Sequence, residues 1–542
     1  MEVRGTARLA ASVLLAAFLV AALPAGAALA QEPCGGHVTA AGGDPCGDVT
    51  GTGRDVFGGK APAWSEIDDE TGAVLIDQVG KNKIAINFTW LLVTGFLVLF
   101  MQAGFALVET GFTRARNAAH TMAMNFMVFA LGVVGYYLVG FALQFGGASG
   151  ITALGGLPPL TGKFCIGDWC LFGTEGFALT SGGAYDVGVY AFFMFQLVFM
   201  DTAATIVTGA MAERWKWGAF VVYAFFMSML LYPLFGMWAW GGGFLASLGS
   251  QLGLGHGYVD FAGSGVVHAV GGLCALAGAM VLGPRIGRFN EDGSANPMPG
   301  HNIPIAIAGT FILLFGWFGF NPGSTFAATD LRISVAAVNT VLASAFGAVA
   351  AMAWSMRASR YGKPDPGMMA NGMLAGLVGI TAPSGFVSAW AAALIGAVAG
   401  VLVVESIRFL ERRRVDDPVG AVSVHGTCGL WGVIALGLFA DGTYGAGWNG
   451  VEGTVRGLLY GDPSQLVAQL VGVAVLLVWA FGLSWVFFKV QDRIQGIRVS
   501  PEAELAGLDL PLMGAAAYPE FVLDGAGTAE VRVLSDVGGA GS

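Results

Sequence analysis

The stretch VDFAGSGVVHAVGG, residues 259–272, sets a histidine, His268, inside an apolar and glycine-rich run that is long enough to cross a membrane. A second stretch, DDPVGAVSVHGTCG at residues 416–429, does the same with His425. An ionisable side chain within a membrane helix is costly, and it usually faces a polar partner or a water-filled cavity. A packed structural histidine explains one such residue equally well, but two in matching contexts favour a functional site.

An aspartate lies eight residues before each histidine, Asp260 before His268 and Asp417 before His425. Eight helical residues rise about 12 Å, which approaches the middle of a hydrocarbon core about 30 Å thick. If each aspartate marks a membrane surface, both histidines lie near the midplane. Two neutral imidazoles that meet there can share a hydrogen bond, and they can accept and return a proton.

The composition is that of a membrane protein with many spans. Of the 542 residues, 55% are hydrophobic and only 11% are charged, and the mean hydropathy is +0.69. Soluble proteins carry about 25% charged residues. The 85 glycines are typical of membrane helices that approach one another closely. The net charge of −10, without a basic patch, argues against nucleic-acid binding.

The N-terminus is typical of a secretory signal. Arg4 and Arg8 precede an apolar run at residues 9–23, and the sequence GAALA then offers a cleavage site. We therefore expect residues 1–30 to be removed and the mature N-terminus to lie outside; the alternative is a first membrane helix, for which the run is short. Residues 31–85 are polar and glycine-rich, show no helical periodicity and predict an extracytoplasmic extension.

Four cysteines lie in segments that we expect to face an oxidising compartment. Cys34 and Cys46 lie in the extension, and Cys165 and Cys170 lie in the loop sequence FCIGDWC. Both pairs are candidates for disulfides, whose connectivity the sequence leaves open.

Eleven apolar runs have the length of a membrane span and predict an all-α polytopic membrane protein. The transmembrane domain covers residues 86–490, and residues 491–542 form a soluble tail. Only the sequence APSG separates the eighth run from the ninth. The predicted spans are residues 87–112, 120–145, 187–211, 217–248, 262–284, 303–326, 333–357, 368–387, 389–409, 419–440 and 465–489.

The basic residues of the loops predict the orientation, because cytoplasmic loops are enriched in Lys and Arg. Eleven spans and an outside N-terminus place sixteen basic residues inside: Arg114, Arg116, Arg214, Lys216, Arg285, Arg288, Arg357, Arg360, Lys363, Arg408, Arg412, Arg413, Arg414, Lys489, Arg493 and Arg498. The short outer loops carry three: Lys163, Arg332 and Arg456. We expect a protein of the cell (inner or plasma) membrane with a cytoplasmic C-terminus.

The two Asp–His stretches open helices that run in opposite directions. The first opens the fifth span, which runs inwards, and the second opens the tenth, which runs outwards. This arrangement is typical of an inverted repeat, with a site near the midplane between the two halves. The predicted fold is therefore two inverted five-helix repeats plus a final helix.

Aromatic and hydroxyl side chains mark the outer half of the predicted pathway. Trp317, Phe320 and Ser324 recur at i, i+3 and i+7 on one face of the sixth span, although a packing stripe would look the same. Phe199, on the third span, is placed to pair with Phe320 as a plug. Trp240, at the outer end of the fourth span, either anchors that helix or holds a cation over its ring.

Several other polar residues lie in or near the predicted spans. Asp260, at the outer end of the fifth span, either caps that helix or attracts a cation. We expect structural roles for five more: Glu109, Asn125, Gln196, Asp201 and Glu405. The two glutamates lie near cytoplasmic ends of helices, where we expect them to be half solvated.

The sequence lacks the motifs of common enzyme classes. It contains no HExxH, no nucleophile elbow and no P-loop, and it has no TVGYG filter for potassium. No third ligand is clearly placed beside the two histidines for a metal. We therefore predict neither a catalytic activity nor a cofactor.

Six motifs, in order between residues 87 and 505, resemble those of the ammonium transporters of the Amt/Rh superfamily, and of its Amt branch in particular. They are FALVETGFTRARN, FMDTAATIVTGAMAER, WGGG, VDFAGSGVVH, GWFGFNPGS and VSVHGTCG. The resemblance implies eleven helices in two inverted halves, assembled as a homotrimer with one pore per subunit. It implies ammonium or ammonia as substrate, with methylammonium as a further candidate.

The resemblance also implies a role for each residue singled out above. The matching positions are Trp240, Phe199, Ser324 and Asp260 at the site that recruits ammonium, Phe199 and Phe320 at a stacked phenyl gate, Trp317 in the pore lining, and His268 and His425 as the twin histidines.

The tail sequence GIRVSPEAELAGLDL resembles the family's cytoplasmic tail, which couples subunits and can receive a PII-type regulatory protein. The chain then reads PLMGAAAY instead of a His-Gly-Glu-like step, so the sequence does not decide whether a PII-type partner binds. Two other functions stay open. One is an ammonium sensor that signals through the tail, and the other is an intramembrane metalloenzyme, which would carry stoichiometric metal.

Overall fold

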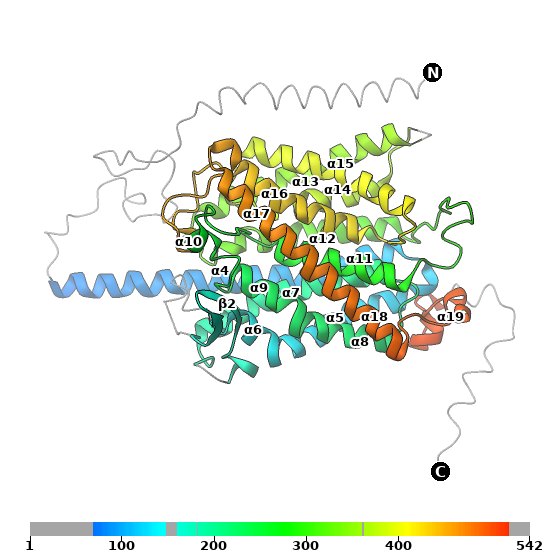
Figure 1. Ribbon diagram of the computed structural model, residues 1–542, viewed down its shortest axis with the longest axis horizontal. Coiled ribbons are helices and arrows are strands. Elements are labelled where there is room, and N and C mark those ends of the chain that lie inside the picture. The colour runs from blue at the N-terminus through cyan, green and yellow to red at the C-terminus, as the bar shows by residue number, and fades with distance from the viewer. Residues whose placement is uncertain (1–68, 148–159, 181–182, 360–361, 520–542) are drawn as a thin grey trace, which may run out of the picture.

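The structure, a computed structural model, describes residues 69–147, 160–180, 183–359 and 362–519. These residues form a bundle of long helices and one two-stranded hairpin (Figure 1). The predicted signal peptide, most of the predicted extension with Cys34 and Cys46, and the end of the tail lie outside the described residues. The predicted all-α class is confirmed.

The elements of the first half come in this order: α4 (Asp69–Phe112), η2 (Ala115–Asn117), α5 (Ala118–Gly135), η3 (Tyr136–Gly140), α6 (Phe141–Phe145), β1 (Lys163–Ile166), β2 (Trp169–Gly173), η5 (Phe177–Leu179), α7 (Val187–Met211), α8 (Trp217–Phe226), η6 (Met227–Leu231), α9 (Tyr232–Ala239), α10 (Leu248–Leu252), η7 (Ser264–Ala269) and α11 (Val270–Leu282). The short turns η3 and η6 join α5 to α6 and α8 to α9 into continuous spans.

The second half and the tail follow: α12 (Ile303–Phe320), η8 (Pro322–Thr325), α13 (Arg332–Ala358), α14 (Pro366–Thr381), α15 (Ala389–Arg412), η9 (Val422–Thr427), α16 (Cys428–Phe439), η10 (Trp448–Gly450), η11 (Leu458–Tyr460), α17 (Pro463–Leu476), η12 (Leu477–Leu483), α18 (Ser484–Gln495), α19 (Pro501–Ala506) and η13 (Asp509–Met513). As the proline in the sixth predicted span suggests, α12 ends just before Pro322 and gives way to a 3-10 turn.

Ten helices in the described residues are long and apolar enough to cross a membrane, and they match ten of the predicted spans. The remaining predicted span, residues 368–387, corresponds to α14, which has 16 residues. This helix packs against both α13 and α15, so it belongs to the bundle although it is shorter than the others. The total of eleven spans stays a prediction.

The expectation of no helix in the extension at residues 31–85 is wrong for its last part, because the helix that contains the first predicted span begins before residue 87. α4 begins at Asp69, has 44 residues and projects beyond the bundle (Figure 1). Its outer turns contain an i,i+4 ion pair between Asp77 and Lys81 at 2.7 Å, which stabilises an exposed helix. A helix that is already formed in the span also extends at little cost, because nucleation is the unfavourable step.

The predicted end of the fourth span, at residue 248, is wrong as well. The helix ends at Ala239, because three consecutive glycines follow Trp240. Gly242 adopts a left-handed φ of 76°, which terminates helices and favours glycine. The early end leaves Trp240 at the helix terminus, where its ring can face the interior.

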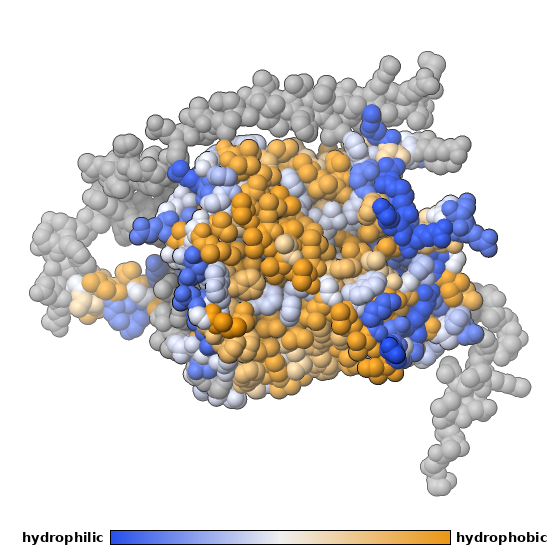
Figure 2. All heavy atoms as spheres, in the orientation of Figure 1, coloured by the Kyte–Doolittle hydropathy of each residue, from blue (hydrophilic) through white to orange (hydrophobic). Residues whose placement is uncertain are grey.

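Apolar side chains cover the visible side of the bundle, and polar side chains gather at its two ends (Figure 2). Phe126 and Val478, for example, are 69% and 75% exposed. A soluble protein rarely leaves apolar surface of this extent in water. This surface faces lipid, and the chain is a multi-pass membrane protein, as predicted.

The two halves of the bundle meet through equivalent elements. The first span, α4, packs along the sixth, α12. The fifth span, formed by η7 and α11, packs against the tenth, formed by η9 and α16. These are the contacts expected when spans 1–5 and 6–10 are related as an inverted repeat.

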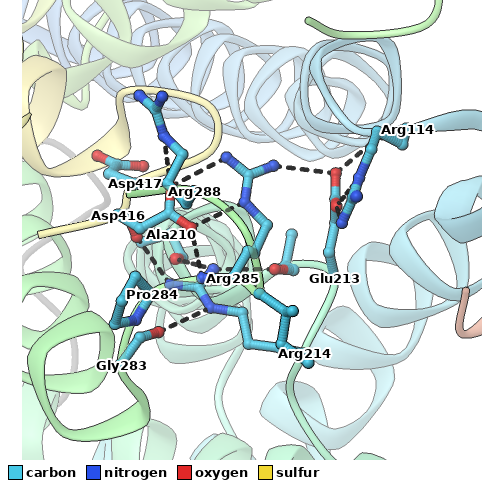
Figure 3. Close-up of polar contacts among 12 residues, drawn as sticks. Arg114, Ala210, Glu213, Arg214, Gly283, Pro284, Arg285, Arg288, Asp416 and Asp417 are labelled. Atoms are coloured by element: carbon cyan, nitrogen blue, oxygen red, sulfur yellow. Dashed lines mark hydrogen bonds and ion pairs between the residues drawn. The ribbon is translucent and has the colours of Figure 1, made fainter. Parts of the chain in front are cut away.

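Buried ion pairs hold several segments together at the end of the bundle that carries the tail (Figure 3). Arg285, which is 3% exposed, contacts Glu213 at 3.1 Å and Asp416 at 2.8 Å. Arg214 donates to the backbone carbonyl of Asp416 at 2.7 Å, and Arg114 pairs with Glu213. Burial alone would raise the pKa of Asp416, but Arg214 and Arg285 hold that pKa well below its usual range.

The first part of the tail docks on this end of the bundle. Glu504, in α19, accepts a hydrogen bond from the backbone N–H of Ile286 at 2.7 Å and pairs with Arg498 at 2.9 Å. Asp509, in η13, accepts from the backbone N–H of His120 at 2.9 Å. The segment predicted as a soluble tail therefore belongs, up to these residues, to the folded domain.

Replacing Arg285 with alanine should destabilise the protein strongly. The change leaves Glu213 and Asp416 as buried carboxylates that have lost a cation, a situation that typically costs about 3–5 kcal/mol. Thermal and denaturant unfolding of the purified protein in detergent measures the loss, with the exposed Arg412→Ala as control. Coincident unfolding transitions for the two variants would contradict the proposed importance of this ion pair.

Candidate functional site

His268 and His425 meet in the interior of the bundle. His268 lies in η7 and His425 in η9, and their Nδ1 atoms are 3.2 Å apart. Both rings are buried, with exposed fractions of 0% and 4%. A neutral imidazole has one donor and one acceptor nitrogen, so one Nδ1 donates to the other. The two predicted residues therefore form a single pair, with one ring from each half of the bundle.

Both histidines lie in π-helical turns, and an aspartate precedes each turn. Asp260 accepts hydrogen bonds from the backbone N–H groups three, five and six residues further on. Asp417 accepts from those three and five residues further on, and all five bonds measure 2.7–3.0 Å. Carboxylates commonly satisfy the free N–H groups at the start of a helix. The shared offset in the sequence thus reflects one capping arrangement, used twice.

Glycines allow the fifth span, formed by η7 and α11, to cross the tenth span, formed by η9 and α16, at very short range. A Cβ atom added at Gly272 would lie 2.1 Å from the backbone nitrogen of Gly426. A Cβ atom added at Gly429 would lie 2.6 Å from the carbonyl oxygen of Ser264. Small residues are what permit backbones to approach in this way. This crossing sets the distance between the two imidazoles.

Two phenyl rings stack beside the histidine pair. The ring centroids of Phe199, in α7, and Phe320, in α12, are 4.1 Å apart with an interplanar angle of 26°. Phe320 also stacks on His268 at 5.4 Å, and Trp317 stacks on His268 at 5.1 Å. The indole N–H of Trp317 donates to Thr381 at 2.9 Å, which fixes its ring. The predicted plug, the predicted pore-lining tryptophan and the histidines therefore form one contiguous column of rings.

A cavity of about 130 Å³, here called the vestibule, lies on the other side of the phenyl pair and is lined in part by Phe199, Trp240 and Ser324. The indole N–H of Trp240 donates to the backbone carbonyl of Asp260 at 2.7 Å, so the ring is held in place. The hydroxyl of Ser324 donates to the carbonyl of Phe320 at 2.7 Å, which leaves its oxygen lone pairs free to accept.

Asp260 itself is not part of the vestibule wall. Its carboxylate is occupied by the helix cap, and its carbonyl holds Trp240. Of the two roles left open by the sequence, the structure supports the cap. Asp260 affects the vestibule indirectly, through the position of the Trp240 indole.

Nine residues that line the vestibule were not among the predicted site residues, and they include Phe195, Gln196, Phe326, Trp448 and Asn449. Phe195 lies one helical turn before Phe199 and contacts its ring at 4.7 Å, so helical spacing could have identified it. Trp448 and Asn449 come from a loop between spans, where no periodicity indicates direction. Phe326 has a left-handed φ of 58°. No sequence pattern predicts this conformation for a phenylalanine, so its position could not be predicted.

A disulfide hairpin is attached close to the vestibule. Cys165 and Cys170 form a disulfide in the antiparallel pair β1–β2, which confirms one of the two candidate pairs. The indole N–H of Trp238 donates to the carbonyl of Leu171 at 2.9 Å, and the backbone N–H of Phe244 donates to that of Cys170 at 3.1 Å. Trp238 thus holds the hairpin, whereas Trp240 faces the vestibule.

A second, smaller cavity of about 20 Å³ is bordered by His425 and Glu109. Glu109 is 3% exposed, so the expectation that it is half solvated is wrong. The reason is that α5, α7 and the segment before η9 close over the end of α4. Glu405, by contrast, has a side chain that is 41% exposed, as expected, and it accepts from the indole of Trp354 at 2.8 Å.

The chemistry available at this site is recognition of a small cation and storage of a proton. Ring faces and a hydroxyl oxygen can bind a cation in the vestibule. Two imidazoles that share one hydrogen bond can pass a proton from one ring to the other. In the part of the chain that the structure describes, no group of three or more His, Cys, Asp and Glu side chains is placed to hold a metal ion.

Comparison with known proteins places these features in a family. The model of the Ammonium Transporter Family matches residues 89–518. Ammonium transporter Amt2 of Archaeoglobus fulgidus is 48% identical over 457 residues, which cover 84% of this chain and 92% of that protein. Ammonium transporter Amt1 of Haloferax mediterranei is 38% identical over 464 residues, 82% of each chain. Both are named as transporters and not as enzymes.

Solved structures are likewise similar to this chain. A protein called Sensor Amt Protein aligns with a TM-score of 0.69 and 35% identity over 80% of this chain and 99% of that one. Mep2 of Candida albicans aligns with a TM-score of 0.65 and 27% identity over 80% of this chain and 90% of that one.

Replacing Gly272 with alanine should separate the two histidines and destabilise the bundle. The added methyl group collides with the backbone at Gly426, which cannot rotate away as a side chain could. Overpacking of this kind typically costs about 1–3 kcal/mol. Thermal unfolding in detergent measures the effect, and Gly218→Ala is the control, because a Cβ atom there meets nothing within 4 Å. Equal melting temperatures for the two variants would mean that the crossing is not tightly packed.

Proposed function

This chain belongs to the ammonium transporter family, and we propose that it binds ammonium in the vestibule, removes its proton at the phenyl pair of Phe199 and Phe320, and passes ammonia along the histidine pair. The observation that carries the proposal is the short contact between His268 and His425, 3.2 Å between Nδ1 atoms, directly behind a stacked phenyl pair. A narrow apolar passage followed by a proton-accepting pair suits a substrate that can exist as a cation and as a neutral molecule.

The energetics explain why deprotonation is needed. A charged group at the centre of a membrane costs from about 2.5 to more than 10 kcal/mol, depending on how it is measured. A cation–π contact returns about 0.5–2 kcal/mol. Ring contacts therefore attract the cation but do not carry it through. Ammonium can lose a proton and become neutral, whereas potassium cannot, and this difference would provide selectivity.

The vestibule suits the first step, recruitment of the cation. Trp240 and Phe199 lie with ring centroids 6.2 Å apart at an angle of 74°, so both border the same space. The free lone pairs of Ser324 can accept a hydrogen bond from the N–H of ammonium. Two ring faces and one acceptor favour a small cation that is also a hydrogen-bond donor.

The histidine pair suits the second step, in which the proton leaves ammonium. His268 Nε2 is buried and has no hydrogen-bond partner among the described residues, so it can accept the proton of ammonium at the phenyl pair. The bond between the two Nδ1 atoms then offers a route for the proton towards His425. Because His425 borders the second cavity, the pair links both sides of the pathway.

Replacing both histidines with leucine should abolish ammonium-evoked current, by at least about ten-fold, because groups that transfer protons typically contribute more than that factor. The measurement is the current evoked by ammonium in proteoliposomes, with potassium as the competing cation. Wild-type protein without its substrate gives the background. Unchanged current together with unchanged selectivity over potassium would refute the relay.

Replacing Trp240 with leucine should weaken recruitment more than it slows the later steps. Loss of a cation–π contact of about 0.5–2 kcal/mol raises the half-saturating ammonium concentration about 2- to 30-fold. Trp238→Leu is the matched control, since that ring holds the hairpin. The concentration dependence of the evoked current gives the half-saturating concentration and the maximal current for each variant. A half-saturating concentration that moves equally in the two variants would exclude a specific role for Trp240.

We further propose that the chain lies in the cell membrane with its tail in the cytoplasm. The ion-pair cluster and the docked tail share one end of the bundle, and the basic residues of the predicted cytoplasmic loops contribute to it. The resemblance noted from the sequence also favours a homotrimer, and it makes a PII-type protein a candidate partner of the tail.

An ammonium sensor is the second candidate function. The likeness to the structure called Sensor Amt Protein and the docking of α19 and η13 on the bundle both favour it. A sensor would show low flux and a tail whose binding to a partner changes with ammonium. High flux in liposomes without such a change would exclude it.

A further inference from the structure

Glu109 is a buried acid that the steps above do not use. It lies near the end of α4, is 3% exposed and borders the same cavity of about 20 Å³ as His425. In the described part of the chain, none of the ion pairs includes it. A buried carboxyl group without a cation needs another explanation for its presence.

The hydrogen bonds around Glu109 define its donors and acceptors. The side-chain amide of Asn125 donates to Oε2 at 2.6 Å and to the carbonyl of Thr121 at 3.1 Å, which uses both of its hydrogens. The hydroxyl of Thr205 donates to the amide oxygen of Asn125 at 2.8 Å, so the orientation of that amide is consistent. One carboxyl oxygen of Glu109 is therefore an acceptor.

The hydroxyl of Thr208 lies between Glu109 and a backbone carbonyl. Its hydroxyl oxygen lies 2.5 Å from the carbonyl oxygen of Thr205 and 3.0 and 2.8 Å from Oε1 and Oε2 of Glu109. A hydroxyl has one hydrogen, and a carbonyl oxygen can only accept. If the hydrogen lies in the shortest contact, to Thr205, the contact with Glu109 requires a hydrogen from the carboxyl group.

The absence of a side chain at Gly209 leaves room for the carboxyl group of Glu109. A Cβ atom added at Gly209 would lie 3.0 Å from Oε1 of Glu109 and 2.5 Å from the side chain of Val419. A cavity of this size accommodates about one water molecule, and therefore also a molecule as small as ammonia. The carboxyl group thus sits at the side of the pathway, next to a space that a substrate molecule fits.

We propose that Glu109 is held as a carboxylic acid and returns a proton to ammonia on the far side of His425 from the vestibule. This inference rests on the proposed function, because it needs ammonia to reach the cavity. The O–H bond of Glu109 breaks and an N–H bond forms, so a carboxylic acid and ammonia become a carboxylate and ammonium. The carboxylate regains a proton from His425, which receives through His268 the proton that ammonium gives up at the phenyl pair. The cycle moves one ammonium and restores the acid form of Glu109, while the two imidazoles switch tautomers and must switch back before the next cycle.

The test is Glu109→Gln. Glutamine keeps the shape of the acid, and it can accept from Asn125 and donate to Thr208, as a protonated glutamate does. It has no proton to transfer. We expect an unchanged melting temperature and an ammonium-evoked current in proteoliposomes that is lower by at least about ten-fold. The infrared band of a protonated carboxyl group should be present in the wild type and weaker in the variant.

Glu405→Gln is the matched control, because that carboxylate is half exposed and lies away from the cavity. Wild-type current in Glu109→Gln would overturn the inference, and so would an infrared band that the substitution leaves intact. A wild-type protein that moves no ammonium would instead overturn the proposed function. The infrared measurement needs no transport, so the two failures can be told apart.

Discussion

The backbone contact between Gly272 and Gly426 is the constraint on which the pathway depends. Neither position carries a side chain, so the fifth and tenth spans cross closely enough for imidazoles on neighbouring turns to share a hydrogen bond. The caps at Asp260 and Asp417 then fix where each π-helical turn begins. Helices further apart would leave two buried rings without partners, at a cost of about 1–3 kcal/mol for each unpaired group.

The candidate site consists of three layers: the vestibule, the phenyl pair and the histidine pair. Each layer suits a different form of the proposed substrate. In the proposed pathway, ring faces and a hydroxyl in the vestibule suit a cation, the stacked phenyl rings mark where it loses its proton, and the imidazoles suit that proton. Each layer draws residues from several helices, and no single helix carries a complete set. The inverted repeat supplies the two histidines, but the phenyl rings come from α7 and α12, which are not equivalent spans. The phenyl pair therefore does not follow the symmetry of the scaffold.

Much of this arrangement could be predicted from the sequence, because the length and composition of an apolar run identify a membrane helix. The pairing of His268 with His425 followed from an offset and a count of spans. Helical spacing placed Trp317 and Phe320 on one face. It did not show that Glu109 is buried, because closure by neighbouring helices depends on tertiary packing. The loop residues Trp448 and Asn449 and the outer turns of α4 were missed for a related reason: neither a loop nor an exposed helix has an apolar face to reveal its position.

The stacked phenyl pair has a consequence for the voltage across the membrane. Protons hop along unbroken files of hydrogen-bonded groups, and two stacked phenyl rings with centroids 4.1 Å apart carry no donor or acceptor that could continue such a file. In the proposed pathway, the stacked pair would therefore stop free protons from crossing when no ammonium is present. A cell with many copies of the protein would then keep its proton gradient while the copies are idle. Only a molecule that carries hydrogen on its own nitrogen, such as ammonium, would bring a proton to His268.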